Sequence, residues 1–398
     1  MILPKFIAVI PVCLAVAAAA EPVTRAEMLE EMGQKLIRVN QFLHDQKLGG
    51  VLLTQVRNFS WVTAGIADNH IVITSETGAA SLLIMDDGKK YVISNNSEMA
   101  RLVAEDLSGL GYEPREFKWY EDKILQDRKL EIVKQLAQGK PIGTDTPYAD
   151  LPVIDAAFTP LRYQLTEPEI RKYRWLGQNS TEAVISVCRR LKPGMTEREM
   201  EVMASDELMR RGIRPTVLLM GVDERLFHFK HTTPTDTPLK NYAFVNVCAR
   251  KWGLVASTGR FVYFGAIPQD LRKRVRASAQ VTAEYVAHSK PGIRAGDLFE
   301  MSKKWYADNG YPGEEQEHHM GGATGYAERE WMAFPGSPEV VHERQAFAWN
   351  PFVKGALSFD TFIVYKDHVE NITGTQDWPV IEVRAGGEVY RLPDILQR

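Results

Sequence analysis

Two long helices, each opened by the same capping signal, constrain the fold of this chain more than any other feature. Thr166 stands three residues before Glu169 in LTEPEIRKYRWLG, and Thr196 stands three residues before Glu199 in LKPGMTEREME. A threonine and a glutamate at this spacing can bond reciprocally to the first backbone N–H groups of a helix. The Pro-Gly pair at 193–194 breaks the chain between them. The sequence therefore predicts two consecutive helices joined by a tight turn.

Strand-like segments follow the second helix. TVLLMG, YAFVNVCAR, WGLVAS and RFVYFG are rich in β-branched and aromatic residues and are separated by turn signals. Helical spacing of apolar residues then predicts two more helices near 269–288 and 296–309. The remainder of the chain alternates short strands and turns, so residues 164–398 are predicted to form one mixed domain.

A separate unit is predicted at residues 24–163. Thr24 is expected to cap a helix that runs to about Gln46, and VLLTQV, IVITS, ASLLIMDD and KKYVISN are expected to be strands. NFSWVTAG is expected to be a turn into another strand. Helices near 99–110 and 122–138 alternate with these strands, which is typical of an α/β domain. The predicted fold class is thus α/β (α+β) with two domains.

Composition excludes some classes of protein. Of the 398 residues, 44% are hydrophobic and 25% are charged, which is typical of a globular chain with enough apolar material for a core. The formal net charge is −3, with no basic excess, so nothing in the charge pattern favours a nucleic-acid partner.

Residues 1–20 have the pattern of a secretory signal peptide. A lysine in MILPK precedes an apolar run that ends in small residues before Glu21. We expect cleavage after about Ala20, a periplasmic or secreted protein, and no membrane attachment after cleavage; an uncleaved membrane anchor is the alternative. Cleavage removes Cys13 and leaves Cys188 and Cys248, which either pair in an oxidising compartment or, as we expect, stay as buried free thiols.

Several motifs, taken in their order, resemble one known family. TEPEI, LKPGMTEREME, the histidine of HTTP, GGATG and SFDT follow one another as in the pita-bread fold of creatinase, prolidase, aminopeptidase P and methionine aminopeptidase. NFSWVTAG resembles the N-terminal domain of the creatinase and aminopeptidase P branch. The resemblance implies a creatinase-like α/β domain at 24–163, a pita-bread domain at 164–398, a homodimer, and a small-molecule or short-peptide substrate.

The resemblance also locates the metal ligands of the family, and all five positions are changed in this chain. The peptidases of the family hold two metal ions with two aspartates, one histidine and two glutamates. The residues in their places here are Asn246 or Cys248, then Ser257, Gly322, Asn350 and Phe359. A carboxylate cage for two divalent ions cannot be built from these side chains. We therefore expect that the metal pair is lost and that no metal cofactor is used.

Other residues at the expected site can still bind or move protons. His231 occupies the HTTP position, which creatinase-like members use for proton transfer, and imidazole ionises near neutrality. Glu330 matches an acidic residue of the family and is expected to orient His231 or the substrate. Asn350 is expected to orient a substrate amide or carbonyl.

Two arginines and two histidines have alternative interpretations. Arg260 and Arg329 either hold a substrate carboxylate or pair with acidic residues such as Glu328, Glu330 and Asp360 in a buried network. His318 and His319 are adjacent, so on a strand they face opposite ways and at most one of them, here taken as His319, faces His231. One of them with His231 is able to hold a single soft ion, but a packed or surface histidine is the preferred interpretation. The predicted substrate-binding residues are Arg260, His319, Arg329, Asn350 and Asp360.

Three functions are compatible with these residues. The first is a metal-independent hydrolase of a C–N bond in a small peptide-like, amide or amidine substrate, with His231 as general base and then general acid. The second is a non-catalytic binding protein that keeps the cleft, which Phe359 in place of a glutamate favours. The third is an Xaa-Pro metallopeptidase with unusual ligands. The first is the preferred prediction.

Overall fold

The computed structural model describes residues 21–124 and 127–398. The predicted signal peptide, residues 1–20, lies outside the described residues. Across the described part of the chain, no helix has the length and apolar character needed to cross a membrane.

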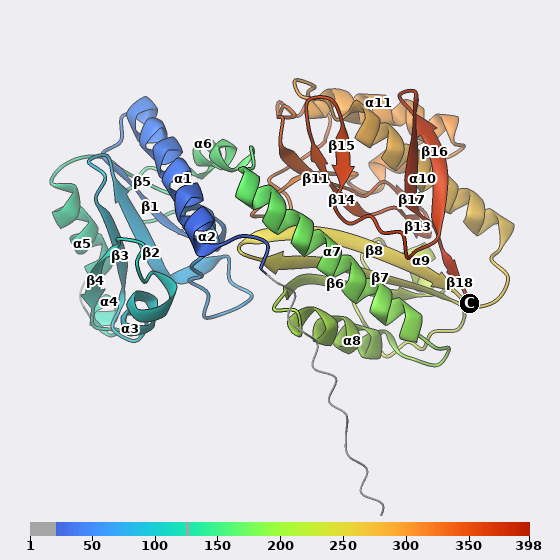
Figure 1. Cartoon of the computed structure of the whole chain (residues 1–398), viewed down its shortest axis with the longest axis horizontal. Helices are drawn as coiled ribbons and strands as arrows, with labels where there is room; N and C mark the ends of the chain where they lie inside the picture. Colours follow the sequence, from blue (N-terminus) through green and yellow to red (C-terminus); the bar gives the residue numbers. More distant parts are fainter. Residues whose placement is uncertain (1–20, 125–126) are drawn as a thin grey trace, which may run out of the picture.

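The N-terminal domain is a five-stranded sheet with helices packed beside it (Figure 1). The strand order is β4-β3-β2-β1-β5, with β3/β4 and β1/β5 parallel and the other pairs antiparallel. The strands are β1 (Gly50–Gln55), β2 (Thr77–Met85), β3 (Lys90–Asn95), β4 (Glu113–Phe117) and β5 (Ile142–Thr144). The helices are α1 (Arg25–Gln46), α2 (Val56–Val62), α3 (Met99–Arg101), a π-helical turn η1 (Leu102–Asp106), α4 (Glu121–Ile124), α5 (Arg128–Ala137), α6 (Asp155–Phe158) and the 3₁₀ turn η2 (Thr159–Arg162).

Two predicted strands of this domain are wrong. NFSWVTAG contributes to helix α2 rather than to a turn and strand. IVITS, residues 71–75, is an exposed loop. The ring of His70, just before it, bonds to Asp68 at 2.9 Å and to the carbonyl of Ser75 at 3.2 Å. The loop closes on itself through these bonds, and its apolar side chains stay 53–67% exposed instead of pairing with the sheet.

The C-terminal domain contains two larger sheets and two β-hairpins. The four-stranded sheet has the order β18-β8-β7-β6 and the five-stranded sheet the order β10-β9-β11-β14-β15. Its helices are α7 (Glu167–Arg190), α8 (Glu197–Met209), α9 (Arg225–His228), α10 (Gln269–His288), α11 (Ala295–Asp308) and the 3₁₀ turn η3 (Glu314–Gln316). Its strands are β6 (Arg214–Val222), β7 (Tyr242–Lys251), β8 (Leu254–Tyr263), β9 (Gly321–Thr324), β10 (Trp331–Met332), β11 (Gln345–Trp349), β12 (Phe352–Val353), β13 (Ala356–Leu357), β14 (Asp360–Val364), β15 (Val369–Asn371), β16 (Val380–Ala385), β17 (Glu388–Pro393) and β18 (Leu396–Gln397).

The capping boxes predicted at Thr24, Thr166 and Thr196 are confirmed, each with both reciprocal hydrogen bonds. Helix α7 lies along strands β7 and β8, and α8 lies against β6 (Figure 1). WGLVAS and RFVYFG form one continuous strand, β8, rather than two. Cys188 and Cys248 are buried free thiols, as expected.

A buried ion-pair network joins the two domains. Lys35 of α1 contacts Glu31 at 2.6 Å and Glu169 of α7 at 2.7 Å, and Lys172 contacts Glu31 at 2.9 Å. All four side chains are at most 1% exposed, and Tyr326 donates a hydrogen bond to Glu169 at 2.8 Å. Because these charges neutralise one another away from water, the network fixes α1 against α7.

Candidate functional site

A pocket of about 150 Å³ lies where β7 meets the segments before β9 and after β11, and we call it the inner pocket. Its walls are part apolar and part polar. The apolar side chains are Val217, Leu219, Phe352, Leu357 and Phe359. The polar side chains are Lys230, His231, Asn246, Cys248, His318, His319, Glu328, Arg329 and Asn350. The mixture suits a small ligand with one apolar part and several polar groups.

Strand β7 supplies the floor of the inner pocket. Asn246 and Cys248 are two residues apart on this strand, so both point to the same face. Cys248 Sγ accepts a hydrogen bond from Ser257 Oγ of β8 at 3.2 Å, and burial raises the pKa of its thiol. Asn246 Oδ1 is buried and has no hydrogen-bond partner among the described residues. Both alternatives for the first aspartate position therefore face the same space.

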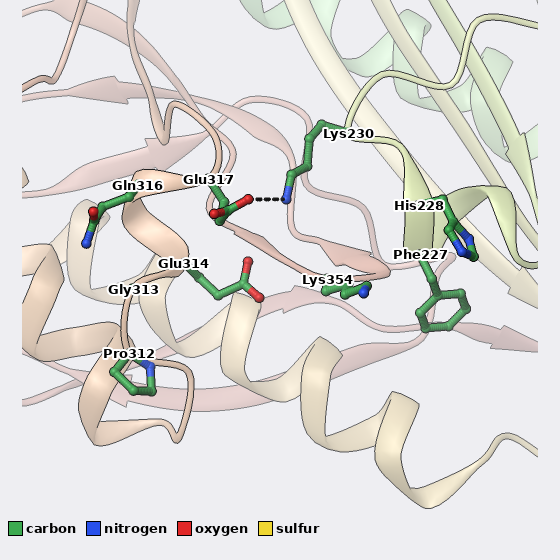
Figure 2. Close-up of a pocket in the computed structure, with 9 residues that line it drawn as sticks. All are labelled: Phe227, His228, Lys230, Pro312, Gly313, Glu314, Gln316, Glu317 and Lys354. Atoms are coloured by element: carbon green, nitrogen blue, oxygen red, sulfur yellow. Dashed lines mark hydrogen bonds and ion pairs between the residues drawn. The ribbon is translucent and has the colours of Figure 1, made fainter.

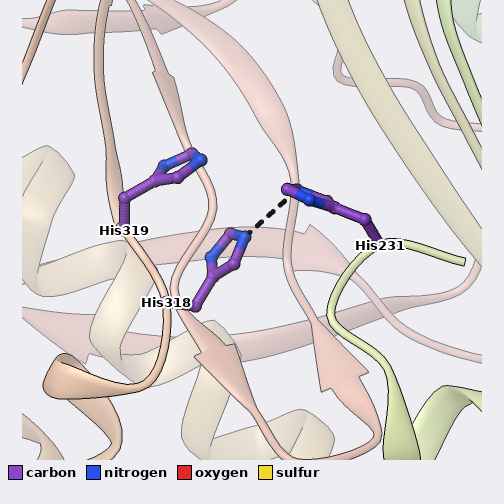
Figure 3. Close-up of side chains that lie close together, drawn as sticks. All are labelled: His231, His318 and His319. Carbon is purple, nitrogen blue, oxygen red and sulfur yellow. Dashed lines mark hydrogen bonds between the residues drawn. The ribbon is translucent and has the colours of Figure 1, made fainter.

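Three histidines converge at one side of the inner pocket (Figure 3). His318 and His319 lie in the loop before β9 rather than on a strand, so the expectation that they face opposite ways is wrong. Their rings stack with centroids 4.3 Å apart, and His318 Nε2 lies 3.3 Å from His231 Nε2. Burial, together with the charges of neighbouring groups, lowers the pKa of His318 to about 4 and that of His319 to about 3. Both rings are therefore neutral at pH 7.

Arg329 is a partly buried cation at the pocket wall, and its Nε atom is fully buried. Its Nη2 donates to Asn350 Oδ1 at 3.2 Å and its Nη1 donates to the carbonyl of Glu328 at 2.5 Å. Burial lowers the pKa of its guanidinium. Within residues 21–124 and 127–398, no carboxylate oxygen lies within 4.0 Å of Arg329, and its buried Nε has no partner. A desolvated cation of this kind attracts an anionic ligand.

Glu330 does not line the inner pocket. Its carboxylate accepts hydrogen bonds from Arg162 Nη2 at 2.6 Å, from Arg162 Nε at 3.2 Å and from the backbone N–H of Tyr326 at 3.0 Å. The side chains of Glu330 and Arg162 are 2% and 1% exposed. The prediction that Glu330 orients His231 or the substrate is therefore corrected, because its oxygens are already used in a buried ion pair.

Arg260 and Asp360 also lie away from the inner pocket. Arg260 Nη1 contacts Asp360 Oδ1 at 2.8 Å, and Arg260 Nη2 donates to the carbonyl of Thr373 at 2.8 Å. Both side chains are at most 1% exposed. The buried-network alternative therefore holds for this pair, and the predicted substrate-binding role does not fit their position. Of the predicted site residues, the structure gathers His231, His319, Arg329 and Asn350.

Backbone packing excludes a side chain at Gly322, the residue that the resemblance places at the family histidine. A Cβ atom built there would lie 2.1 Å from the carbonyl oxygen of Trp331 and 2.8 Å from the Cα of Met332. Gly322 lies on strand β9, which pairs with β10 on one side and with β11 on the other. No residue larger than glycine fits at this position unless β10 moves.

A second, wider hollow of about 700 Å³ lies beside the inner pocket, and we call it the outer pocket (Figure 2). It is lined mostly by polar and charged side chains, including His228 and Lys354, and Lys230 lines both pockets. Lys230 Nζ lies 3.4 Å from Glu317 (Figure 2). Although the outer pocket is larger, the inner pocket is the better candidate site. Four residues that line the inner pocket carry a buried polar atom without a partner among the described residues, namely Asn246, His318, His319 and Arg329, whereas Glu314 is such a residue in the outer pocket.

Sequence reasoning did not place His318, Lys230 or Glu328 in this pocket, whereas Cys248 was one of the two alternatives for the first aspartate position. The histidine of HTTP and the glycines of GGATG each mark one position in the sequence. They do not predict the conformation of the loop around that position. The adjacent pair His318-His319 was itself the available signal, but a strand was assumed there.

The chain belongs to metallopeptidase family M24, whose sequence profile matches residues 171–376. An uncharacterized peptidase of Staphylococcus aureus is 23% identical over 314 residues, which cover 75% of this chain and 85% of that protein. The prolidase of Pyrococcus horikoshii OT3 superposes with a TM-score of 0.72 at 16% identity, covering 86% of this chain and 99% of its own. The dipeptidase PepE of Mycobacterium ulcerans superposes with a TM-score of 0.72 at 16% sequence identity. The superposition covers 87% of this chain and 96% of PepE. These similarities confirm the predicted pita-bread family and fold.

The side chains of the inner pocket do not make up the donor set of the family's metal pair. Asn350, Phe359 and both alternatives for the first aspartate position, Asn246 and Cys248, line the pocket, so three of the five ligand positions that the resemblance implies offer only a neutral amide, a thiol or a phenyl ring. Glu328 is the sole carboxylate lining the pocket in the described part of the chain. Two divalent ions of the family type need several carboxylates to bind and to bridge them.

Proposed function

We propose that this chain hydrolyses a C–N bond in a small peptide-like substrate that carries a carboxylate, and that it does so without the metal pair of its family. One observation carries the proposal, namely the partly buried Arg329 guanidinium that lines the inner pocket, with no carboxylate oxygen of the described residues within 4.0 Å of it. A substrate carboxylate supplies the missing negative charge and can take two parallel hydrogen bonds from the guanidinium. Asn350, which already accepts a hydrogen bond from Arg329, extends this polar wall.

Metal independence is supported by the chemistry of the donor positions. Asparagine, cysteine and phenylalanine replace the carboxylates, and the glycine at 322 leaves no space for a ligand side chain. The polar character of the pocket persists nevertheless, in three histidines, two asparagines and Arg329. A pocket that has lost its metal ligands but kept ionisable groups is suited to general acid–base catalysis.

His231 is the proposed proton-transfer residue. It is the exposed member of the histidine group and stands at the pocket wall. In the proposed reaction, a water oxygen forms a bond to the carbonyl carbon while His231 takes the water proton. The C–N bond then breaks, and His231 returns the proton to the leaving nitrogen. Glu330 has no part in this proposal, because Arg162 holds its carboxylate.

Turnover by the chelator-treated protein tests the proposal. A panel of Xaa-Pro and other dipeptides, N-acyl amino acids and carboxylate-bearing amidines is followed by amine release. The expected result is turnover of at least one member, a fall in kcat of about 10²–10⁴-fold in His231→Ala, and a raised KM in Arg329→Met. His368→Ala, an exposed histidine paired with Asp367, is the matched control and keeps wild-type rates. Turnover that His231→Ala leaves unchanged contradicts the assigned role.

A second candidate function is a non-catalytic binding protein that captures a peptide or metabolite. Phe359 favours it, because its buried phenyl ring lines the inner pocket in place of a metal-binding glutamate. A ligand from the same panel that stabilises wild type and His231→Ala equally, without turnover in either, supports this candidate over the first.

A further inference from the structure

His231, His318 and His319 are arranged as ligands of a metal ion, although they come from two distant segments (Figure 3). One side-chain nitrogen of each lies within 4.8 Å of a nitrogen of the other two. Two of the three follow each other in the loop before β9, and the third lies in the loop before β7. The rings point toward a common space rather than away from each other (Figure 3).

The separation of the ring nitrogens agrees with tetrahedral coordination. Zinc–imidazole bonds of about 2.0–2.1 Å at a tetrahedral angle place two ligand nitrogens about 3.3–3.4 Å apart. His231 Nε2 and His318 Nε2 are 3.3 Å apart. The ligand nitrogen of His319 lies within 4.8 Å of those of His231 and His318, so a tetrahedral site requires it to move closer by up to about 1.5 Å.

A second observation points to a ligand at this place. In the part of the chain that the structure describes, the Nδ1 atom of His319 is buried without a hydrogen-bond partner, so it is available to bind an ion. Buried polar atoms are normally satisfied by protein, water or a bound ion. Asn246 Oδ1, in the same pocket, is also buried and unpartnered.

We propose that His231, His318 and His319 bind a single divalent transition-metal ion, of the kind that prefers imidazole nitrogen. Three imidazoles select Zn²⁺, Co²⁺, Ni²⁺ or Cu²⁺ over Mg²⁺, Ca²⁺ or Mn²⁺, which prefer oxygen. This site is chemically distinct from the carboxylate-held pair of the family, and it uses none of the five family ligand positions. All three histidines line the inner pocket, so an ion that they hold is accessible to a ligand in that pocket.

The site has a consequence for the reaction, and this consequence rests on the proposed function. An ion held by His231 takes up a ring nitrogen that the proposed proton transfer needs. Binding of Zn²⁺ therefore inhibits the metal-independent hydrolysis, and removal of the ion restores it. The inner pocket thus links substrate turnover to the availability of a transition metal.

The test is a titration of the tag-free, chelator-treated protein with Zn²⁺ by calorimetry, and with Co²⁺ by visible absorption. We expect one equivalent of each ion, a tetrahedral Co²⁺ spectrum, and no saturable binding of Mg²⁺. His231→Ala and the double variant His318→Ala/His319→Ala each weaken Zn²⁺ binding by at least about 100-fold. His228→Ala is the matched control, since its ring nitrogen is bonded to the Glu224 carbonyl at 2.7 Å outside the group, and it binds like wild type.

Three results overturn the metal site: no saturable Zn²⁺ binding, binding of two ions per chain, or unchanged binding in the histidine variants. His231 is exposed, so His231→Ala keeps the test decisive if the double variant does not fold. The titration does not need a substrate, so it tests the metal site even if no substrate is turned over. Zn²⁺ binding that raises turnover supports the site and contradicts the metal-independent reaction, which separates the two proposals.

Discussion

The replacement Glu330→Gln distinguishes a structural glutamate from a catalytic one. The structure places the Glu330 carboxylate on the guanidinium of Arg162, with both side chains almost fully buried. Glutamine keeps the shape of the side chain and one acceptor oxygen but removes the negative charge. Arg162 then keeps hydrogen bonds to Asn58 and Thr159, but its positive charge is left buried without an anion.

Removal of one partner of a buried ion pair costs about 3–5 kcal/mol, and the remaining acceptor places this variant near the lower value of about 3 kcal/mol. Unfolding entropy of about 2.1 cal/mol/K per residue gives about 0.5 kcal/mol/K for a unit the size of residues 164–398. The expected loss in Tm is therefore about 6 °C.

Thermal unfolding followed by circular dichroism measures this loss. Glu382→Gln is the matched control, because its partner Arg391 is 3.8 Å away and both side chains are 67% exposed. An exposed pair contributes about 0–1 kcal/mol, so the control moves Tm by no more than about 2 °C. A Glu330→Gln protein with wild-type Tm and no hydrolysis refutes the structural assignment and returns Glu330 to the catalytic machinery.

Three further predictions follow from the structure. Burial raises the pKa of Glu169, but the ammonium groups of Lys35 and Lys172 outweigh it and lower this pKa to about 2. The ionised Glu169 therefore stabilises the fold at pH values above the ordinary glutamate pKa of about 4.3, and this stabilisation is lost as the pH falls towards 2. When Tm is measured against pH, the difference between wild type and Glu169→Gln is expected to shrink as the pH falls over this range. Gly322→Ala destabilises the chain by about 1–3 kcal/mol in urea unfolding through its clash with Trp331, whereas Gly33→Ala, with nothing within 4 Å of the new methyl group, stabilises α1 by up to about 1 kcal/mol. Arg329→Lys raises KM for carboxylate-bearing substrates by less than Arg329→Met does, because lysine keeps the charge but not the forked hydrogen bonds; equal KM values in both variants and wild type contradict carboxylate binding.

Local signals predicted local structure well. The three capping boxes, the limits of α10 and the breaks around the helices depend on residues within one turn of each other, and all were found in the sequence. The stretch after β1 was mistaken for a turn and strand, because Phe59, Trp61 and Val62 are typical of strands but are buried here on a helix by tertiary contacts.

The site was only partly predictable, because its chemistry depends on contacts between distant residues. Glu330 and Arg162 are 168 residues apart, and Arg260 and Asp360 are 100 apart, so their pairing cannot be inferred from spacing. The order of the motifs drew attention to Asn246, Cys248, Asn350 and Phe359, all of which line the inner pocket. It did not show that the loop before β9 turns both His318 and His319 toward His231.

The most direct test of the metal-independent reaction is a measurement of metal content and hydrolysis on the same samples. The protein is incubated with Mn²⁺, Co²⁺ or Zn²⁺, desalted, analysed by plasma mass spectrometry, and assayed before and after exhaustive chelation. We predict at most one tightly bound equivalent, which chelation removes without loss of hydrolysis. Two equivalents that disappear on chelation together with the cleavage of Xaa-Pro dipeptides would contradict the proposal and show that unusual ligands hold a working metal pair.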